Sequence, residues 1–159
     1  MFKELLKSKI PITDTLYLRY DINALIKAEE KNINPFALQF PIPLDYLRVG
    51  LDCCFSELGL SDVQCSEVVS QTVKLPWEYL QSKVLEATKQ ALPPPIIGSK
   101  YDGTKPDFKK LRDLFVDIMG RTNEEFLSST LAEITERWND YAVFNGYIPP
   151  AQTFKQFDD

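Results

Sequence analysis

The residues best able to do chemistry in this chain are its three cysteines, because the sequence contains no histidine. Cys53 and Cys54 are adjacent, and Cys65 follows on a later segment. Structural zinc sites use Cys and His ligands at characteristic spacings, so these residues make a poor metal site. A nucleophilic thiol or serine needs a neighbouring base, and the sequence offers none in view. We therefore predict reduced core thiols, with no metal and no cofactor.

The carboxylates form the second group with chemical potential. Asp21 precedes Glu29 and Glu30, and Glu124 is adjacent to Glu125. Acidic residues in such places are typical of helix caps and solvated helix faces. The chain also lacks a glycine-rich phosphate loop. The sequence thus predicts a protein that is not an enzyme, with a site built only from carboxylates as the alternative.

Length and composition limit which other classes of protein are possible. The chain has 159 residues, 44% of them hydrophobic and 12% aromatic, which is enough for one domain or two small lobes. Its net charge of −5 repels phosphate backbones, so we expect no nucleic-acid partner. No apolar run is long enough to span a bilayer, and the N-terminus lacks the apolar core of a signal peptide. We expect a cytoplasmic protein without a membrane partner.

The elements that position these residues begin with one predicted strand. Thr15–Tyr20 alternates and is rich in aromatic and bulky apolar residues, and Pro11 implies that the strand starts no earlier than Ile12. It pairs either with the N-terminal segment or with a strand of another subunit, because a lone edge strand promotes association.

Helices follow this strand up to residue 92. Asp21 is a good N-cap for a helix that ends near Asn32. The best patterned helix has Leu44, Leu47, Leu51, Cys54, Phe55 and Leu58 on one face and ends at Gly59. Ser61 and Gln64 form a capping box for the next helix, and Pro76 marks the start of a third.

A break rich in proline and glycine then divides the chain. Residues 93–106 include three consecutive prolines, which favour an extended spacer, or alternatively a polyproline ligand for an aromatic groove. We therefore predict an N-terminal helical domain over residues 1–92, a linker over 93–106, a C-terminal helical region over 107–146 and a flexible tail over 147–159.

The C-terminal region has two apolar stripes at helical spacing. The first comprises Phe108, Leu111, Leu114, Phe115, Ile118 and Met119 and ends at Gly120. Thr130 and Glu133 form a capping box for the second helix, whose stripe comprises Leu131, Ile134, Trp138, Tyr141 and Ala142. With Glu125 and Phe126 in a turn-like segment between them, the two helices predict an αα-hairpin. Such a hairpin needs the rest of the chain, or a partner, to bury both stripes.

The order and spacing of these features resemble those of phage (siphophage and prophage) tail assembly chaperones. In the N-terminal half, the resemblance rests on a strand followed by Asn23, Ala24, Leu25, Glu29 and Glu30, then Leu47, Arg48 and Leu51, then Glu67 and Val68. In the C-terminal half it rests on Met119, Gly120, Glu124, Glu125, Phe126, Thr130 and Glu133. Together these segments cover most of the chain.

The resemblance implies a mainly α-helical fold with one N-terminal strand or short hairpin, and a helper made during tail assembly that is absent from the mature virion. The N-terminal part would coat the long helical tape measure protein, and the C-terminal part would recruit the tail tube protein. Self-association would also be expected. The candidate contact residues, each of which could instead be core, are Leu47, Leu51, Phe55, Phe126, Trp138 and Tyr141.

Two other classes of protein remain open. The chain could be a small acidic adaptor or regulator that binds one protein through its C-terminal hairpin. It could also be a structural virion component similar to a head–tail connector. Both alternatives, like the chaperone, act by binding rather than by catalysis.

Overall fold

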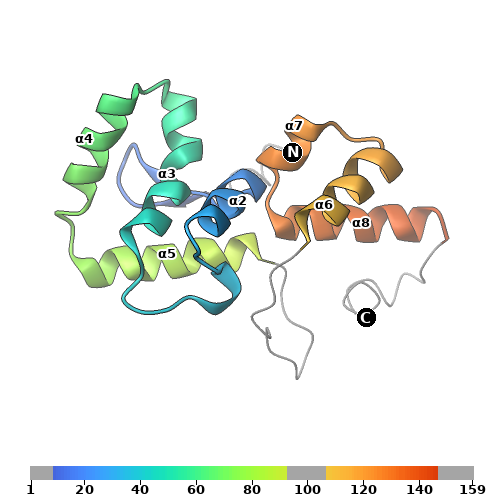
Figure 1. Cartoon of the computed structure of the whole chain (residues 1–159), viewed down its shortest axis with the longest axis horizontal. Helices are drawn as coiled ribbons and strands as arrows, with labels where there is room; N and C mark the ends of the chain where they lie inside the picture. The colour runs from blue at the N-terminus through green and yellow to red at the C-terminus, as the bar shows by residue number, and fades with distance from the viewer. Residues whose placement is uncertain (1–8, 93–106, 147–159) are drawn as a thin grey trace.

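A computed structural model describes residues 9–92 and 107–146 (Figure 1). The described residues form a mainly α-helical protein with a short antiparallel hairpin near the N-terminus, which confirms the predicted fold class. The predicted linker over 93–106, the predicted tail over 147–159 and residues 1–8 lie outside the described residues.

The hairpin is shorter than the sequence predicted. Strand β1 (Ile10–Pro11) pairs with β2 (Tyr17–Leu18), with Ile10 opposite Leu18 and Pro11 opposite Tyr17. The partner of the predicted strand is therefore the N-terminal segment of the same chain. Only two residues of each strand pair, because the loop between the strands forms its own hydrogen bonds. The Thr13 hydroxyl accepts a hydrogen bond from the Leu16 amide at 3.0 Å. The prediction that the strand extends over Thr15–Tyr20 was wrong.

Helix α2 (Ile22–Glu30) starts where the sequence predicted. The Asp21 carboxylate accepts a hydrogen bond from the Ala24 amide at 2.8 Å and caps the helix. A short 3-10 turn, η1 (Pro35–Ala37), follows and is capped by Asn34. These elements lie between the two helical parts of the molecule in Figure 1.

Three longer helices complete the N-terminal part. Helix α3 (Leu44–Leu58) ends at Gly59, whose φ of 68° provides the left-handed cap. The predicted capping box of Ser61 and Gln64 starts α4 (Asp62–Thr72), and α5 (Trp77–Ala91) begins after Pro76. Gly50 lets Tyr20 pack against α3, because a Cβ at residue 50 would lie 2.5 Å from the Tyr20 ring.

The C-terminal part contains more helical segments than a simple αα-hairpin. Helix α6 (Phe108–Arg112) continues into a π-helical stretch, η2 (Asp113–Ile118). The segment expected to be turn-like is a short helix, α7 (Asn123–Ser128), which Thr122 caps through the Glu125 amide. Helix α8 (Leu131–Phe144) begins at the predicted capping box of Thr130 and Glu133. The two predicted helices are therefore present, with a third one between them.

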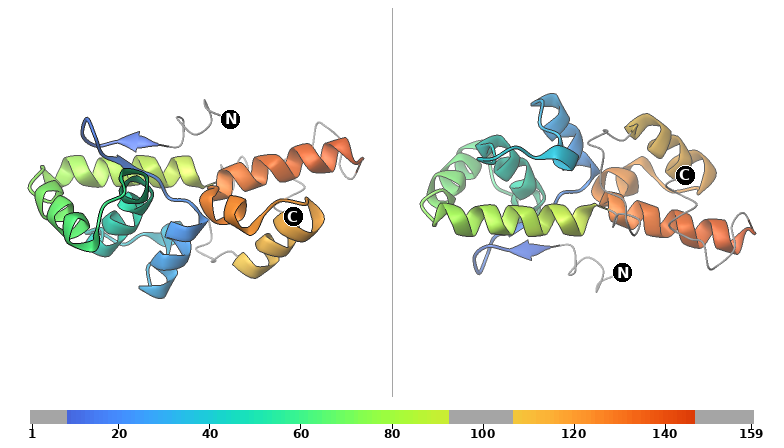
Figure 2. Two further views of the ribbon diagram at one scale, coloured as in Figure 1. Left: turned by 90° about the horizontal axis from the view of Figure 1, so that it is seen from above. Right: turned by 90° about the horizontal axis from the view of Figure 1, so that it is seen from below.

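The two parts are packed against each other. Helix α7 contacts α2, and α8 contacts α5, so that α5 and α8 run nearly end to end (Figures 1 and 2). Buried Phe115, Phe126 and Ile134 belong to the same apolar cluster as Leu18 and Leu25 of the N-terminal part. The two parts therefore share a continuous core, although a proline-rich segment separates them in the sequence.

Polar contacts from Arg19 fix this junction. The Arg19 side chain is 2% exposed, and its Nη2 donates to the Ser128 carbonyl and to Glu133 Oε1, both at 2.8 Å. The Ile22 amide, at the start of α2, donates to the Ser129 carbonyl at 2.8 Å. Glu133 also accepts from the Thr130 amide as part of the capping box. One carboxylate thus starts α8 and joins the two parts.

Candidate functional site

Four of the six predicted contact residues are core residues in the structure. Leu47, Leu51 and Phe55 lie on the inner face of α3, and Phe126 of α7 packs with its ring centroid 6.1 Å from that of Phe115. None of these four side chains is more than 4% exposed. A partner could contact these side chains only if the core opened. A surface that a partner can bind must therefore lie elsewhere on the protein.

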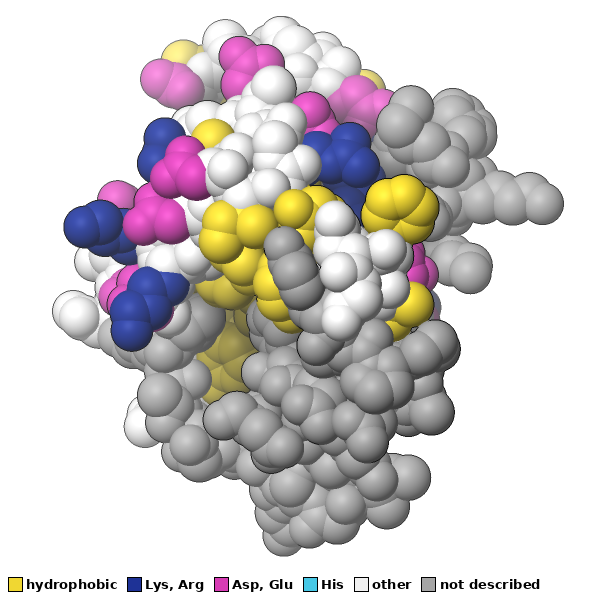
Figure 3. Space-filling view, turned by 90° about the vertical axis from the view of Figure 1, so that its right-hand side faces the viewer, with side chains coloured by type: hydrophobic (Ala, Val, Ile, Leu, Met, Phe, Trp, Pro, Cys, Tyr) yellow, Lys and Arg dark blue, Asp and Glu magenta, His cyan; other side chains and the backbone are white. Residues whose placement is uncertain are grey.

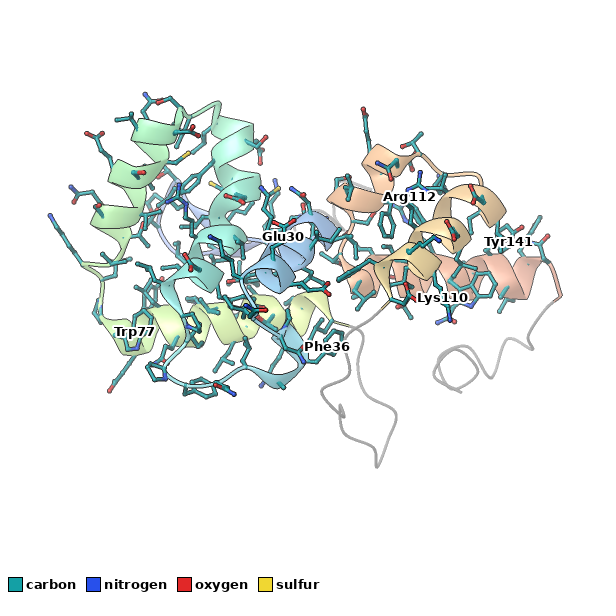
Figure 4. The ribbon with its side chains drawn as sticks, in the orientation of Figure 1. Glu30, Phe36, Trp77, Lys110, Arg112 and Tyr141 are labelled. Atoms are coloured by element: carbon teal, nitrogen blue, oxygen red, sulfur yellow. The ribbon has the colours of Figure 1, made fainter. Side chains whose placement is uncertain are left out.

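The remaining two predicted residues lie on α8 at the far end of the C-terminal part. The rings of Trp138 and Tyr141 are half-buried and stack with centroids 5.9 Å apart. The Tyr141 hydroxyl donates to the Ile118 carbonyl at 3.2 Å. Ile118 is 53% exposed and Phe144 is 89% exposed. We call these four residues the C-terminal patch. Figure 4 labels Tyr141, and Figure 3 shows hydrophobic side chains on the face at this end of the molecule.

Ile118 is exposed because the helix before it changes period. The sequence placed Ile118 on the apolar stripe of an α-helix, where it would have been buried. In the structure the Met119 amide bonds the Leu114 carbonyl at 3.0 Å, five residues back, as in a π-helix. This wider turn rotates the following side chains, so Phe115 points into the core and Ile118 points to solvent.

The described residues of the N-terminal part form a groove, which we call the α4 groove. Its volume is about 810 Å³. The loop of the β-hairpin, the end of α3 and one side of α4 form its walls. The apolar residues that line it are Leu16, Leu58, Leu60, Val63, Val68 and Leu75; the others are Thr13, Thr15, Ser66, Glu67, Ser70, Gln71 and Thr72.

Local chemistry explains why this groove forms. The left-handed cap at Gly59 and the capping box at Ser61 turn the chain sharply between α3 and α4. Helix α4 has few apolar residues to bury and contributes only Val69 and Thr72 to the buried set. Its groove side keeps Val63 exposed at 72%, next to half-exposed Leu58 of α3. Apolar side chains therefore face an open depression rather than a neighbouring helix.

The surroundings of the groove are acidic. Between Arg48 and Lys74 the sequence has Asp52, Glu57, Asp62 and Glu67 and no basic residue. Asp52 pairs with Lys27 at 2.9 Å and Glu57 with Lys9 at 3.3 Å. Within residues 9–92 and 107–146, no ion pair neutralises Asp14, Asp62 or Glu67. The border of the groove therefore carries unpaired negative charge.

A hydrogen-bonded cluster holds the hairpin against α3 beside this groove. The Tyr17 hydroxyl donates to the Glu57 carboxylate and lies 3.6 Å from the Cys53 sulfur. Hydrogen bonds from Tyr17 and Lys9 lower the pKa of Glu57, whereas burial raises the pKa of both Tyr17 and Cys53. A raised thiol pKa disfavours the thiolate, so Cys53 is a poor nucleophile at neutral pH. The cluster supports the hairpin wall of the groove.

Other kinds of site were sought in the part of the chain that the structure describes. No group of three or more Cys, Asp or Glu side chains there is placed to hold a metal ion. No described helix combines the length and the apolar character that crossing a bilayer requires. No protein-family model, curated protein or solved structure matches the chain. The α4 groove and the C-terminal patch are the two exposed apolar surfaces taken forward as candidate sites.

The sequence carried a signal for the groove that periodicity alone did not reveal. Leu58, Leu60 and Val63 are apolar residues clustered around a helix–helix turn, where a tight connection usually has polar residues. Val63 also lies between Ser61 and Gln64, the capping box of a helix with few other apolar positions. The turn and the start of α4 thus contain more apolar residues than the helix can bury. This excess was the sign in the sequence that an apolar surface is exposed here.

Proposed function

We propose that this protein is a non-enzymatic tail assembly chaperone that shields an exposed apolar helix of the tape measure protein. The observation that carries the proposal is the α4 groove, an open depression lined by apolar side chains. A long helical partner with an exposed apolar stripe aggregates in water, and a groove of this kind covers one face of such a helix. The resemblance of the sequence to tail assembly chaperones supports the same role.

The groove has dimensions that suit a helix. A helix with its side chains is about 10 Å wide and rises about 5.4 Å per turn, which corresponds to about 420 Å³ per turn. The groove volume of about 810 Å³ therefore equals about two turns. A helix that is half immersed would contact the groove along about four turns, about one turn more than the length of α4, which has 11 residues. An apolar helix face is thus a suitable occupant in both size and chemistry.

The C-terminal patch is the corresponding surface for the tail tube protein in this proposal. Ile118 and Phe144 are exposed, and the stacked pair of Trp138 and Tyr141 lies beside them. Exposed aromatic residues next to half-buried ones are common at protein interfaces. The protein would act in the host cytoplasm and would leave before the virion matures. The alternative, a small acidic adaptor, would use one of the two surfaces for one partner.

Co-expression tests the proposal most directly. The full chain is produced together with the long helical protein encoded next to it, and the soluble fraction of that protein is measured. We expect the soluble fraction to rise at least severalfold and to fall back with Val63→Asp, because a charge in the groove opposes apolar contact. Phe144→Asp, the same kind of change at an exposed position outside the groove, should leave this effect intact.

The same two variants separate the two surfaces. Capture of the tail tube protein should be lost with Phe144→Asp and retained with Val63→Asp. Trp138→Ala should also weaken capture of the tube protein, because Trp138 belongs to the C-terminal patch. Phe126→Ala, predicted from the sequence to act in the same way, removes a core ring and would unfold the C-terminal part instead. A long helical partner equally soluble with and without this chain would refute the proposal.

A further inference from the structure

The chemistry of the α4 groove says more about its occupant than its shape alone. Five of the seven α4 residues that line the groove recur at intervals of three and four and form one face of the helix: Val63, Ser66, Glu67, Ser70 and Gln71. Two of these are serines, whose short side chains allow a second helix to approach closely, at an interaxial distance of about 8 Å. The face therefore suits a helix packed alongside α4.

Two of the hydroxyl groups in the groove are already satisfied without a polar ligand. The Ser70 hydroxyl donates to the Ser66 carbonyl at 3.0 Å, and the Thr72 hydroxyl donates to the Val68 carbonyl at 2.8 Å. Both groups are satisfied by the backbone of their own helix, so covering them with an apolar side chain leaves no donor unpaired. This arrangement favours an apolar helix face over a polar small molecule.

The charges in and beside the groove are mostly negative. Among the lining residues that the structure describes, Glu67 is the charged one. Asp14, Glu57 and Asp62 are adjacent in the sequence to lining residues of the hairpin loop, α3 and α4, respectively. One basic residue, Lys74 after the end of α4, is likewise adjacent in the sequence to a lining residue, Leu75. An occupant with positive charge beside its apolar face complements this border, and one with negative charge is repelled.

We infer that the α4 groove binds an amphipathic helix whose apolar face is bordered by lysine or arginine. The inference rests on the proposed function and adds the chemistry that selects the partner segment. The apolar side chains of the helix contact Leu58, Val63 and Leu60. Its basic side chains pair with Glu67 and Asp62 at the border, which the described part of the chain leaves without a partner.

Three synthetic helices of about five turns test the inference with the full chain. The first has leucines at helical spacing with lysines on both sides of the apolar face. The second replaces every lysine by glutamate. The third keeps the lysines but scatters the leucines around the helix. Affinity is measured by fluorescence anisotropy of the labelled helices at low salt.

We expect the lysine-bordered helix to bind about tenfold more tightly than the glutamate-bordered one, because several exposed ion pairs act together. The difference should shrink in about 0.5 M salt, which screens charges within a few ångströms. The scattered helix should not bind. Glu67→Lys should reduce the preference for lysine, and Val63→Asp should remove binding, whereas Phe144→Asp should leave the affinity unchanged.

The results of these binding experiments can refute the inference without refuting the proposed function. Equal affinity for the lysine and glutamate helices, or no binding of either, would refute the inferred chemistry. If co-expression still kept the full-length partner soluble in a Val63-dependent way, the chaperone role would stand. Binding that survives Val63→Asp and is lost with Phe144→Asp would refute the groove as the site.

The N-terminal segment of the chain is the competing occupant. Residues 1–8, outside the described residues, contain Phe2, Leu5 and Leu6 together with Lys3 and Lys7, the same chemistry as the inferred partner. Leu6→Asp in the full chain tests this competition. An affinity for the lysine-bordered helix that rises more than threefold would assign the groove to this segment and would overturn the inference of an external helix. An unchanged affinity supports it.

Discussion

The N-terminal and C-terminal parts of the protein obtain their cores in different ways. Residues 9–92 contain α3 and α5, each of 15 residues, and bury most of the large apolar side chains among themselves. Residues 107–146 contain helices of 5 and 6 residues beside the longer α8. Helices this short are not stable alone. We therefore expect the C-terminal part to depend on the N-terminal part, through the shared apolar core and the contact of Arg19 with Glu133.

Removing Arg19 is the strongest way to test that dependence. Arg19→Ala leaves Glu133 and the Ser128 carbonyl without their buried donor, so we expect a loss of about 3–5 kcal/mol in the free energy of unfolding. Hydrogen exchange should show that α7 and α8 lose protection before α3 and α5 do. Lys27→Ala is the control, because its exposed pair with Asp52 contributes about 1 kcal/mol or less. Equal effects of the two variants would contradict the dependence.

A change inside the N-terminal core should have the opposite regional effect. In Gly50→Ala, the new methyl group would lie 2.5 Å from the buried Tyr20 ring, so packing must shift. We expect a destabilisation of about 1–3 kcal/mol in urea unfolding, after a partial offset from the better helix propensity of alanine. Loss of exchange protection should begin in α2 and α3. A neutral or stabilising effect would show that the ring moves freely.

The two capping boxes provide a matched comparison between the parts. Ser61→Ala removes a cap at the exposed turn before α4, where water can replace the lost bond. Thr130→Ala removes a cap that is 1% exposed at the junction. We expect losses of about 0.5–1 kcal/mol for the first and about 1–2 kcal/mol for the second, measured as shifts of the urea midpoint. Equal losses would mean that the junction is accessible to water.

The smallest expected effect concerns Asp21, at the junction end of α2. Burial raises the pKa of Asp21 above the ordinary aspartate value of 3.8, while the hydrogen bond from the Ala24 amide opposes the rise. The ionised carboxylate therefore opposes folding at neutral pH. Asp21→Asn keeps a good cap, so we expect a Tm at pH 7 equal to or slightly above that of the wild type.

The pH dependence of this variant has a definite sign. As the pH falls through the raised pKa towards 3.8, the native state takes up a proton before the unfolded state does. The wild type should therefore gain stability relative to Asp21→Asn over that window. Thermal unfolding of both proteins from pH 7 to about pH 3 measures the difference. A wild type that loses stability relative to the variant on acidification would contradict the sign.

Local signals predicted the helix boundaries well. The caps at Asp21, Ser61 and Thr130 and the left-handed residue Gly59 are all in the predicted places. Each depends on bonds between groups a few residues apart, so the sequence alone contains both partners. The predicted turn-like segment around Phe126 was wrong, because Thr122 caps a short helix there that packing against α2 stabilises.

The candidate site was harder to predict than the fold. Periodicity placed Leu47 and Leu58 on the same apolar face of α3, yet Leu47 is buried and Leu58 is 51% exposed. The difference arises because the core covers only part of the length of α3, and its last turn extends to the groove. A stripe of apolar residues indicates which side of a helix is apolar, and not how far along it another element packs.

By itself, the sequence determined the mainly α-helical class, the caps and the ends of the helices, and the acidic character of α4. These properties depend on side-chain type and on interactions within about one helical turn. Two features depend instead on the tertiary structure: the contact of Arg19 with Glu133, 114 residues away, and the position of Leu58 and Val63 beside an open groove. Burial depends on which distant surfaces come together, and no local pattern specifies that.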